Sequence, residues 1–152
     1  MGAPKMSMPF RLTSSRLLIP LAHESIPAGF PSPAEDYMDA GIDLNEHLIQ
    51  HPASTFFLRV EGESMINAGI QDGDLLVVDR SLDPQSGHIV VAAVDGAFTL
   101  KRLVHHQGVL YLKPDNPNYQ PIDLRHYSDV HIWGVATYSI HTITRRTKQF
   151  RS

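Results

Sequence analysis

A serine in a glycine-containing turn, Ser64, is the first residue whose type and setting suggest chemistry. It follows an apolar run that ends at Val60, and Gly62 lies two positions before it. Such a turn can expose the hydroxyl and aim successive backbone N–H groups at one point, as an oxyanion hole requires. A turn serine more often stabilises the turn or caps a helix, so Ser64 alone decides little. The Gly-x-Ser-x-Gly motif is absent, which disfavours an α/β-hydrolase.

A serine nucleophile needs a base, and Lys101 is the candidate. It lies inside the apolar run 98–103, where strand alternation places Thr99 on the same face and Arg102 on the other. A free lysine has a pKa of about 10.4, and lowering it to 7 costs about 4.6 kcal/mol. Burial can supply that change, and Thr99 can then hold the neutral amine towards Ser64. The alternative is an ordinary solvated lysine on a strand.

The nine histidines do not form a recognisable metal motif. His47 and His51 are spaced like two ligands on one helical turn, but the zincin glutamate and a third ligand are missing. His105 and His106 are adjacent and are expected in a loop, pointing in different directions. No glycine loop has a phosphate-binding spacing either. We therefore expect neither a metal nor a cofactor.

Short apolar runs separated by glycines predict one all-β domain from residue 55 to the early 140s. Apolar or alternating runs predict six strands, at 56–60, 74–79, 88–94, 98–103, 109–112 and 130–138. The runs 75–78 and 89–94 suit strands buried on both faces. Asp95 and Gly96 predict a two-residue hairpin loop, because both residues tolerate positive φ.

The segment before this domain has no clear periodicity and is rich in proline. We interpret residues 1–34 as a flexible arm, because proline fixes its own φ and restricts the preceding residue. Residues 35–50 are expected to hold a short helical piece, interrupted by Gly41 and ended by Pro52. The predicted organisation is an arm at 1–34, a domain at 35–143 and a basic tail at 144–152.

Composition excludes several classes of protein. The chain has 152 residues, a net charge of −3 and no cysteine, so it does not resemble a nucleic-acid binder, a disulfide scaffold or a thiolate zinc protein. No apolar run is long enough to span a membrane, and we expect a cytoplasmic protein. Basic residues gather at both ends. Solvated tails explain this most simply, and a weak contact with a nucleoprotein is the alternative.

The motifs together resemble the self-cleaving domain shared by the LexA repressor, phage repressors and UmuD. The resemblance runs from Ala28 to Thr142 and rests on the order and spacing of several segments. These are the cleavage-type sequence 28–34, the serine turn Gly62-Glu63-Ser64-Met65, the run 69–79, the lysine strand 98–101 and the later segments 112–119 and 132–135. It implies a β-clip fold, Ser64 as nucleophile, Lys101 as base, supporting roles for Met65 and Thr99, and cleavage between Ala28 and Gly29.

The branch of the family determines the expected role. Only 28 residues precede Gly29, too few and too proline-rich for the helix-turn-helix domain of the repressors, so the chain is similar to UmuD. The resemblance implies a homodimer that cuts itself when a RecA filament on single-stranded DNA promotes the reaction. The product would join a UmuC-like polymerase in error-prone translesion synthesis during the SOS response. Sequence-specific DNA binding is not expected.

The cleavage segment itself is suited to an extended conformation. Ile26 and Phe30 each precede a proline and are therefore biased towards β or polyproline geometry. The 35 residue steps between Gly29 and Ser64 can span up to about 115 Å, so cutting within one chain and between two chains both remain open. Three other interpretations remain: a LexA-like regulator without its DNA-binding domain, a signal-peptidase-like enzyme, and a non-catalytic β adaptor or inhibitor.

Overall fold

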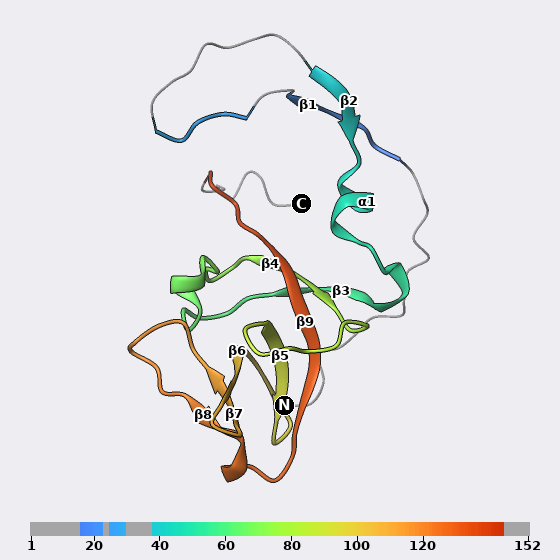
Figure 1. Cartoon of the computed structure of the whole chain (residues 1–152). Helices are drawn as coiled ribbons and strands as arrows, with labels where there is room; N and C mark the ends of the chain where they lie inside the picture. The colour runs from blue at the N-terminus through green and yellow to red at the C-terminus, as the bar shows by residue number, and fades with distance from the viewer. Residues whose placement is uncertain (1–15, 23–24, 30–37, 145–152) are drawn as a thin grey trace. The chain divides into compact units, whose positions relative to one another are not determined.

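The computed structural model describes residues 16–22, 25–29 and 38–144. These residues belong to two compact units that divide between Pro52 and Ala53. Each unit is described by itself (Figure 1). No helix in the described part of the chain is long and apolar enough to span a membrane.

The first unit contains a two-stranded sheet and a short helix. Strand β1 (Ile19–Ala22) pairs antiparallel with β2 (Met38–Ile42), with Ile19 opposite Ile42. Helix α1 (Leu44–Leu48) follows directly. It begins at Asp43, whose side chain accepts a hydrogen bond from the backbone N–H of Asn45. The 3-10 turn η1 (Pro52–Ser54) leads into the second unit.

The helical prediction for residues 35–50 is correct only for α1 and wrong for Met38–Ile42, which form a strand. Gly41 has a φ of +114°, which a right-handed helix does not allow. The pairing partner of β2 lies about twenty residues earlier in the chain, so local periodicity gave no sign of it. The structure thus adds β1, for which the sequence predicted no element.

The second unit is a seven-stranded antiparallel sheet with the order β3-β4-β9-β5-β6-β7-β8. Its long last strand pairs with β5 through its first half and with β4 through its second half, and Figure 1 shows this strand running across the unit. The strands are β3 (Thr55–Arg59), β4 (Leu75–Asp79), β5 (Ile89–Val94), β6 (Ala97–His106), β7 (Val109–Lys113), β8 (Ile122–Asp123) and β9 (Val130–Ile140), with the 3-10 turns η2 (Ile66–Ala68) and η3 (Leu124–His126) between them.

The six predicted strands of this unit and its mainly β character are confirmed. The Asp95–Gly96 hairpin is also confirmed, with φ values of +46° and +84° at its two loop residues. The expectation that His105 and His106 lie in a loop is wrong, because both are the last residues of β6. A second two-residue turn at Gln107 and Gly108, again with positive φ, follows them directly.

The core forms two clusters because β5 is buried on both faces, as its continuous apolar run predicted. Val91 packs with Met65, Val78 and Trp133 in one cluster, whereas Val90 belongs to the other. The indole of Trp133 lies 4.6 Å from the guanidinium carbon of Arg80 and also contacts Phe56 and Phe98. The full clusters are Val60, Met65, Ile70, Leu76, Val78, Val91 and Trp133, and Val90, Ala92, Leu103, Leu112 and Val135.

Candidate active site

Ser64 lies in a tight turn between β3 and η2. Gly62 has a φ of +87°, a conformation that favours glycine, and its N–H donates to Asp72 Oδ1 at 2.7 Å. The N-cap of η2 is Met65, which makes no side-chain capping bond, so Ser64 is not a helix cap. The hydroxyl of Ser64 instead contacts a side chain from β6.

That side chain is Lys101, whose Nζ lies 3.0 Å from Ser64 Oγ. The same nitrogen lies 2.8 Å from Thr99 Oγ1 and 3.0 Å from the Leu100 carbonyl oxygen. Lys101 is only 9% exposed, which the sequence allowed but could not establish. Alternation along β6 correctly placed Thr99 and Lys101 on one face.

The environment of Lys101 shifts its protonation equilibrium towards the neutral amine. Burial lowers the pKa of Lys101, because desolvation disfavours the ammonium form. A neutral amine has two N–H donors and one lone pair. The Leu100 carbonyl can only accept, so it takes one N–H, and the Thr99 hydroxyl can take the second. The lone pair is then left for the hydroxyl proton of Ser64, which is the arrangement that a general base requires.

Met65 fixes the turn from the core side. Its side chain is 2% exposed and packs in the cluster of Val78, Val91 and Trp133. Its carbonyl accepts hydrogen bonds from Ala68 and Ile70. Burial of the residue next to Ser64 therefore prevents the turn from rotating freely, while Ser64 itself stays half-exposed.

Ser64 and Lys101 line a groove of about 550 Å³ between the residues around β3 and the start of β6. Its walls are mostly apolar, with Leu58 and Val60 from one side and Phe98 and Leu100 from the other. β3 hydrogen-bonds only to β4, so its other edge is open among the described strands. A groove next to an open edge suits an extended peptide, which can add as a strand.

Backbone donors near Ser64 are available for a developing negative charge. In the segments that the structure describes, the backbone N–H groups of Ser64 and Met65 make no hydrogen bond, whereas those of Ile66, Asn67 and Ala68 do. Two adjacent N–H groups beside a nucleophile are what an oxyanion hole requires.

The structure thus brings Ser64, Lys101, Thr99 and Met65 together, and their catalytic and supporting roles stay predictions. Ala28 and Gly29 belong to the other unit, where both lie exposed in a bend between β1 and β2. Their role as the cleaved bond stays a prediction.

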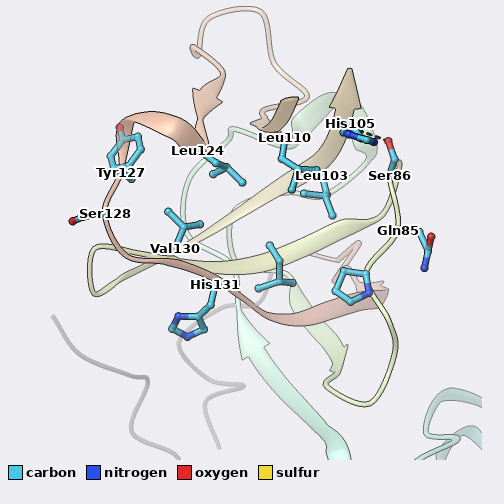
Figure 2. Close-up of a pocket in the computed structure, with 12 residues that line it drawn as sticks. Gln85, Ser86, Leu103, His105, Leu110, Leu124, Tyr127, Ser128, Val130 and His131 are labelled. Atoms are coloured by element: carbon cyan, nitrogen blue, oxygen red, sulfur yellow. Dashed lines mark hydrogen bonds between the residues drawn. The ribbon is translucent and has the colours of Figure 1, made fainter. Parts of the chain in front are cut away.

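A second, larger hollow of about 690 Å³ contains none of the predicted site residues. Leu103, Leu110 and Leu124 contribute apolar side chains to it, and His105 and Ser86 lie at one side (Figure 2). The backbone N–H of His105 donates to Ser86 Oγ at 3.0 Å. Among residues 16–22, 25–29 and 38–144, no group of three or more His, Cys, Asp or Glu side chains is placed to hold a metal ion.

Sequence reasoning missed the residues that support the serine turn from the 114–119 loop. Asp115 and Asn116 hydrogen-bond to residues on either side of Ser64. The Pro-Asp-Asn-Pro sequence is typical of a turn, but nothing in it indicates which part of the chain that turn contacts.

Comparison with known proteins agrees with this geometry. Residues 20–137 match the peptidase S24-like family model. The chain is 47% identical over 133 residues to protein ImpA of Escherichia coli, covering 87% of each chain. It is 46% identical over 128 residues to protein SamA of Salmonella typhimurium, covering 84% of this chain and 88% of SamA. It is 42% identical over 133 residues to protein MucA of Escherichia coli, covering 80% of this chain and 84% of MucA.

The family match spans most of the second unit, including both residues of the Ser64–Lys101 pair. The mainly β architecture is consistent with the β-clip fold expected of this family. The chain therefore belongs to the S24 family of serine peptidases and is a UmuD-like member of it.

Proposed function

We propose that this protein cleaves its own chain between Ala28 and Gly29, using Ser64 as nucleophile and Lys101 as general base. The observation that carries the proposal is the 3.0 Å contact between Lys101 Nζ and Ser64 Oγ, made by a lysine that is 9% exposed. An apolar pair at these positions would stabilise the fold better than a buried lysine next to a serine hydroxyl, because burying the amine costs free energy.

The first half of the reaction forms an acyl-enzyme. Neutral Lys101 accepts the Ser64 proton as Oγ attacks the Ala28 carbonyl carbon. The N–H groups of Ser64 and Met65 stabilise the resulting oxyanion. The intermediate collapses by breaking the bond to Gly29, and the Lys101 ammonium donates its proton to the departing Gly29 amine.

The second half releases the peptide that ends at Ala28 from Ser64. A water molecule attacks the ester between Ala28 and Ser64 Oγ, with Lys101 again accepting a proton and then returning it to Ser64. The product that begins at Gly29 carries the whole second unit. Because nucleophile and substrate belong to the same protein, positioning of the arm is the natural point of control.

The biological role is proposed from the UmuD-like family. In the cytoplasm, a RecA filament on single-stranded DNA would promote docking of the arm, either within one chain or across a homodimer. The shortened product would then join a UmuC-like polymerase and support translesion synthesis in the SOS response. The similarity to ImpA, SamA and MucA supports this role.

The test follows the intact mass of the full chain. At pH 10 without activator, or at pH 7.5 with RecA, ATP and single-stranded DNA, we expect loss of the first 28 residues. Ser64→Ala and Lys101→Ala should stay intact under both conditions. A wild-type chain that stays intact in both assays would favour the alternative of a non-catalytic β module, and cleavage of Ser64→Ala would refute the assigned nucleophile.

A further inference from the structure

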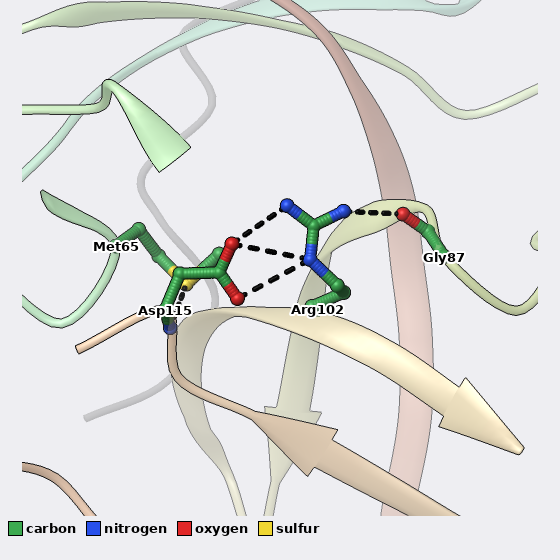
Figure 3. Close-up of polar contacts among 4 residues, drawn as sticks. All are labelled: Met65, Gly87, Arg102 and Asp115. Carbon is green, nitrogen blue, oxygen red and sulfur yellow. Dashed lines mark hydrogen bonds and ion pairs between the residues drawn. The ribbon is translucent and has the colours of Figure 1, made fainter. Parts of the chain in front are cut away.

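Arg102 follows the proposed base directly on β6, and its side chain leaves the opposite face of the strand. Its Nη2 lies 2.6 Å from Asp115 Oδ2, and its Nε lies 3.2 Å from both carboxylate oxygens. Its Nη1 donates to the Gly87 carbonyl at 2.6 Å (Figure 3). The guanidinium fork is therefore held at both ends, and hydrogen bonding to Asp115 raises the pKa of Arg102.

Asp115 connects this fork to the turn that carries the proposed nucleophile. Its backbone N–H donates to Met65 Sδ at 3.3 Å, and its carbonyl accepts from the Asn67 N–H at 2.9 Å. Figure 3 shows Met65 and Arg102 on opposite sides of Asp115. The carboxylate thus faces β6, while the backbone of the same residue faces the serine turn.

The next residue holds the turn from its other side. Asn116 Nδ2 donates to the Glu63 carbonyl at 2.9 Å. Residues 63, 65 and 67 of the turn are therefore each hydrogen-bonded to Asp115 or Asn116. Ser64 lies between these attachment points, and its own backbone N–H makes no hydrogen bond in the described segments. The position of Oγ therefore depends on where Asp115 and Asn116 are held.

We propose that Arg102 and Asp115 are positioning residues that set the distance between Ser64 and Lys101. One strand, β6, fixes the amine through Lys101 and fixes the serine turn through the Arg102–Asp115 pair. The inference rests on the proposed function, because it concerns the rate of the same self-cleavage. Catalytic groups displaced by about 1 Å lose up to about a hundredfold in rate.

The effect is geometric rather than electrostatic. Burial is the resolved cause of the lowered pKa of Lys101, and the Arg102 charge is already paired with Asp115. Arg102→Lys keeps the charge but loses the fork that binds both the carboxylate and the Gly87 carbonyl. We therefore expect it to lower the plateau of cleavage at high pH and to leave the pH of half-maximal rate unchanged.

The experiment measures self-cleavage of the full chain from pH 7 to 11 at 25 °C, with the folded fraction checked by circular dichroism. Arg102→Lys and Asp115→Asn should each cleave about tenfold to a hundredfold more slowly per folded molecule at the plateau. The double variant should be no slower than the slower single variant, because both changes break one contact. A purely structural role would lower the melting temperature without changing the rate per folded molecule.

The chain supplies a matched control in a second pair of the same kind. Arg125 Nη2 lies 2.7 Å from Asp123 Oδ2, and Arg125 Nε contacts both oxygens. Asp123 also caps η3, and among the described residues this pair makes no hydrogen bond or ion pair with the serine turn. Arg125→Lys should cleave at the wild-type rate.

Three results would overturn the inference alone, with the wild type still cleaving: a wild-type plateau in Arg102→Lys, a shifted pH midpoint with an unchanged plateau, or an equal loss in Arg125→Lys. A wild-type chain that never cleaves would instead refute the proposed function and the inference with it.

Discussion

Replacing Thr99 by valine tests how the amine of Lys101 is held. The hydroxyl of Thr99 accepts a hydrogen bond from Lys101 Nζ at 2.8 Å. Valine has nearly the same shape and is favoured in strands, so β6 should keep its structure. The variant removes one of the three partners of Nζ and leaves Ser64 and the Leu100 carbonyl in place.

The magnitude differs between the two protonation states of the lysine. A hydrogen bond from a charged donor contributes about 1.5–3 kcal/mol, and one from a neutral donor about 0.5–1.5 kcal/mol. The ammonium thus loses about 1 kcal/mol more than the neutral amine, so Thr99→Val lowers the pKa of Lys101 further. At a pH well below the pKa of Lys101, the variant should therefore hold about fivefold more neutral lysine than wild type. The loss of orientation lowers the plateau by about twofold to tenfold.

The two effects predict a deficit that depends on pH. Thr99→Val should cleave about twofold to tenfold more slowly than wild type at pH 10 and at nearly the same rate at pH 7. Rates are measured by intact mass over time at each pH, with Thr99→Ser as the control that keeps the hydroxyl. A variant-to-wild-type ratio that is constant from pH 7 to 10, or a larger deficit at pH 7, would refute this account of the amine.

Three further predictions concern stability, measured by urea unfolding. Wild type should gain stability relative to Lys101→Met as the pH rises towards the unfolded pKa of lysine, about 10.4, because burial lowers the folded pKa of Lys101 and the cost of holding it neutral disappears there. A stability difference that does not change with pH would contradict this. Although burial raises the pKa of Asp74, hydrogen bonds from Gln71, His141 and Ser139 hold it below its usual value of 3.8. Asp74→Asn should therefore lower the free energy of unfolding by about 1–3 kcal/mol at pH 7. Wild type should lose this extra stability only as the pH falls below 3.8. Equal stability of the two proteins at pH 7 would count against the buried network. Gly134→Ala should cost about 1–3 kcal/mol by overpacking, because its Cβ would lie 2.5 Å from Val78 Cγ1; an unchanged urea midpoint would show that β4 and β9 can separate there.

Strands whose own residues are apolar could be predicted from the sequence, and those that depend on a distant partner could not. The run Leu75–Asp79 is buried along most of its length, so its composition alone indicated a central strand. In contrast, Met38–Ile42 and Ile122–Asp123 become strands only by pairing with β1 and β7. The end of β6 was missed for a similar reason, because the turn at Gln107 requires positive φ in a residue that rarely adopts it.

The candidate site divides in the same way. Alternation along one strand placed Thr99 beside Lys101, because that relation is local. Ser64 and Lys101 are 37 positions apart in the sequence. The prediction that they meet came from the family resemblance rather than from the residues themselves. The support from Asp115 and Asn116 was not predicted, because its contacts are mostly with backbone atoms of the serine turn, which leave no pattern in the side chains.

If the proposed function holds, the burial of Lys101 also couples docking of the substrate to activation of the base. Lys101 retains 9% exposure, and it lines the groove beside Ser64. On the proposed function, a peptide docked in that groove would remove the remaining water from the amine, and further desolvation lowers the pKa of a lysine. Docking would thus raise the fraction of neutral lysine at the same moment as it places the Ala28 carbonyl near Ser64. An activator that only stabilises the docked arm would then accelerate cleavage more at pH 7 than at pH 10, because the fraction of neutral lysine is smaller at the lower pH.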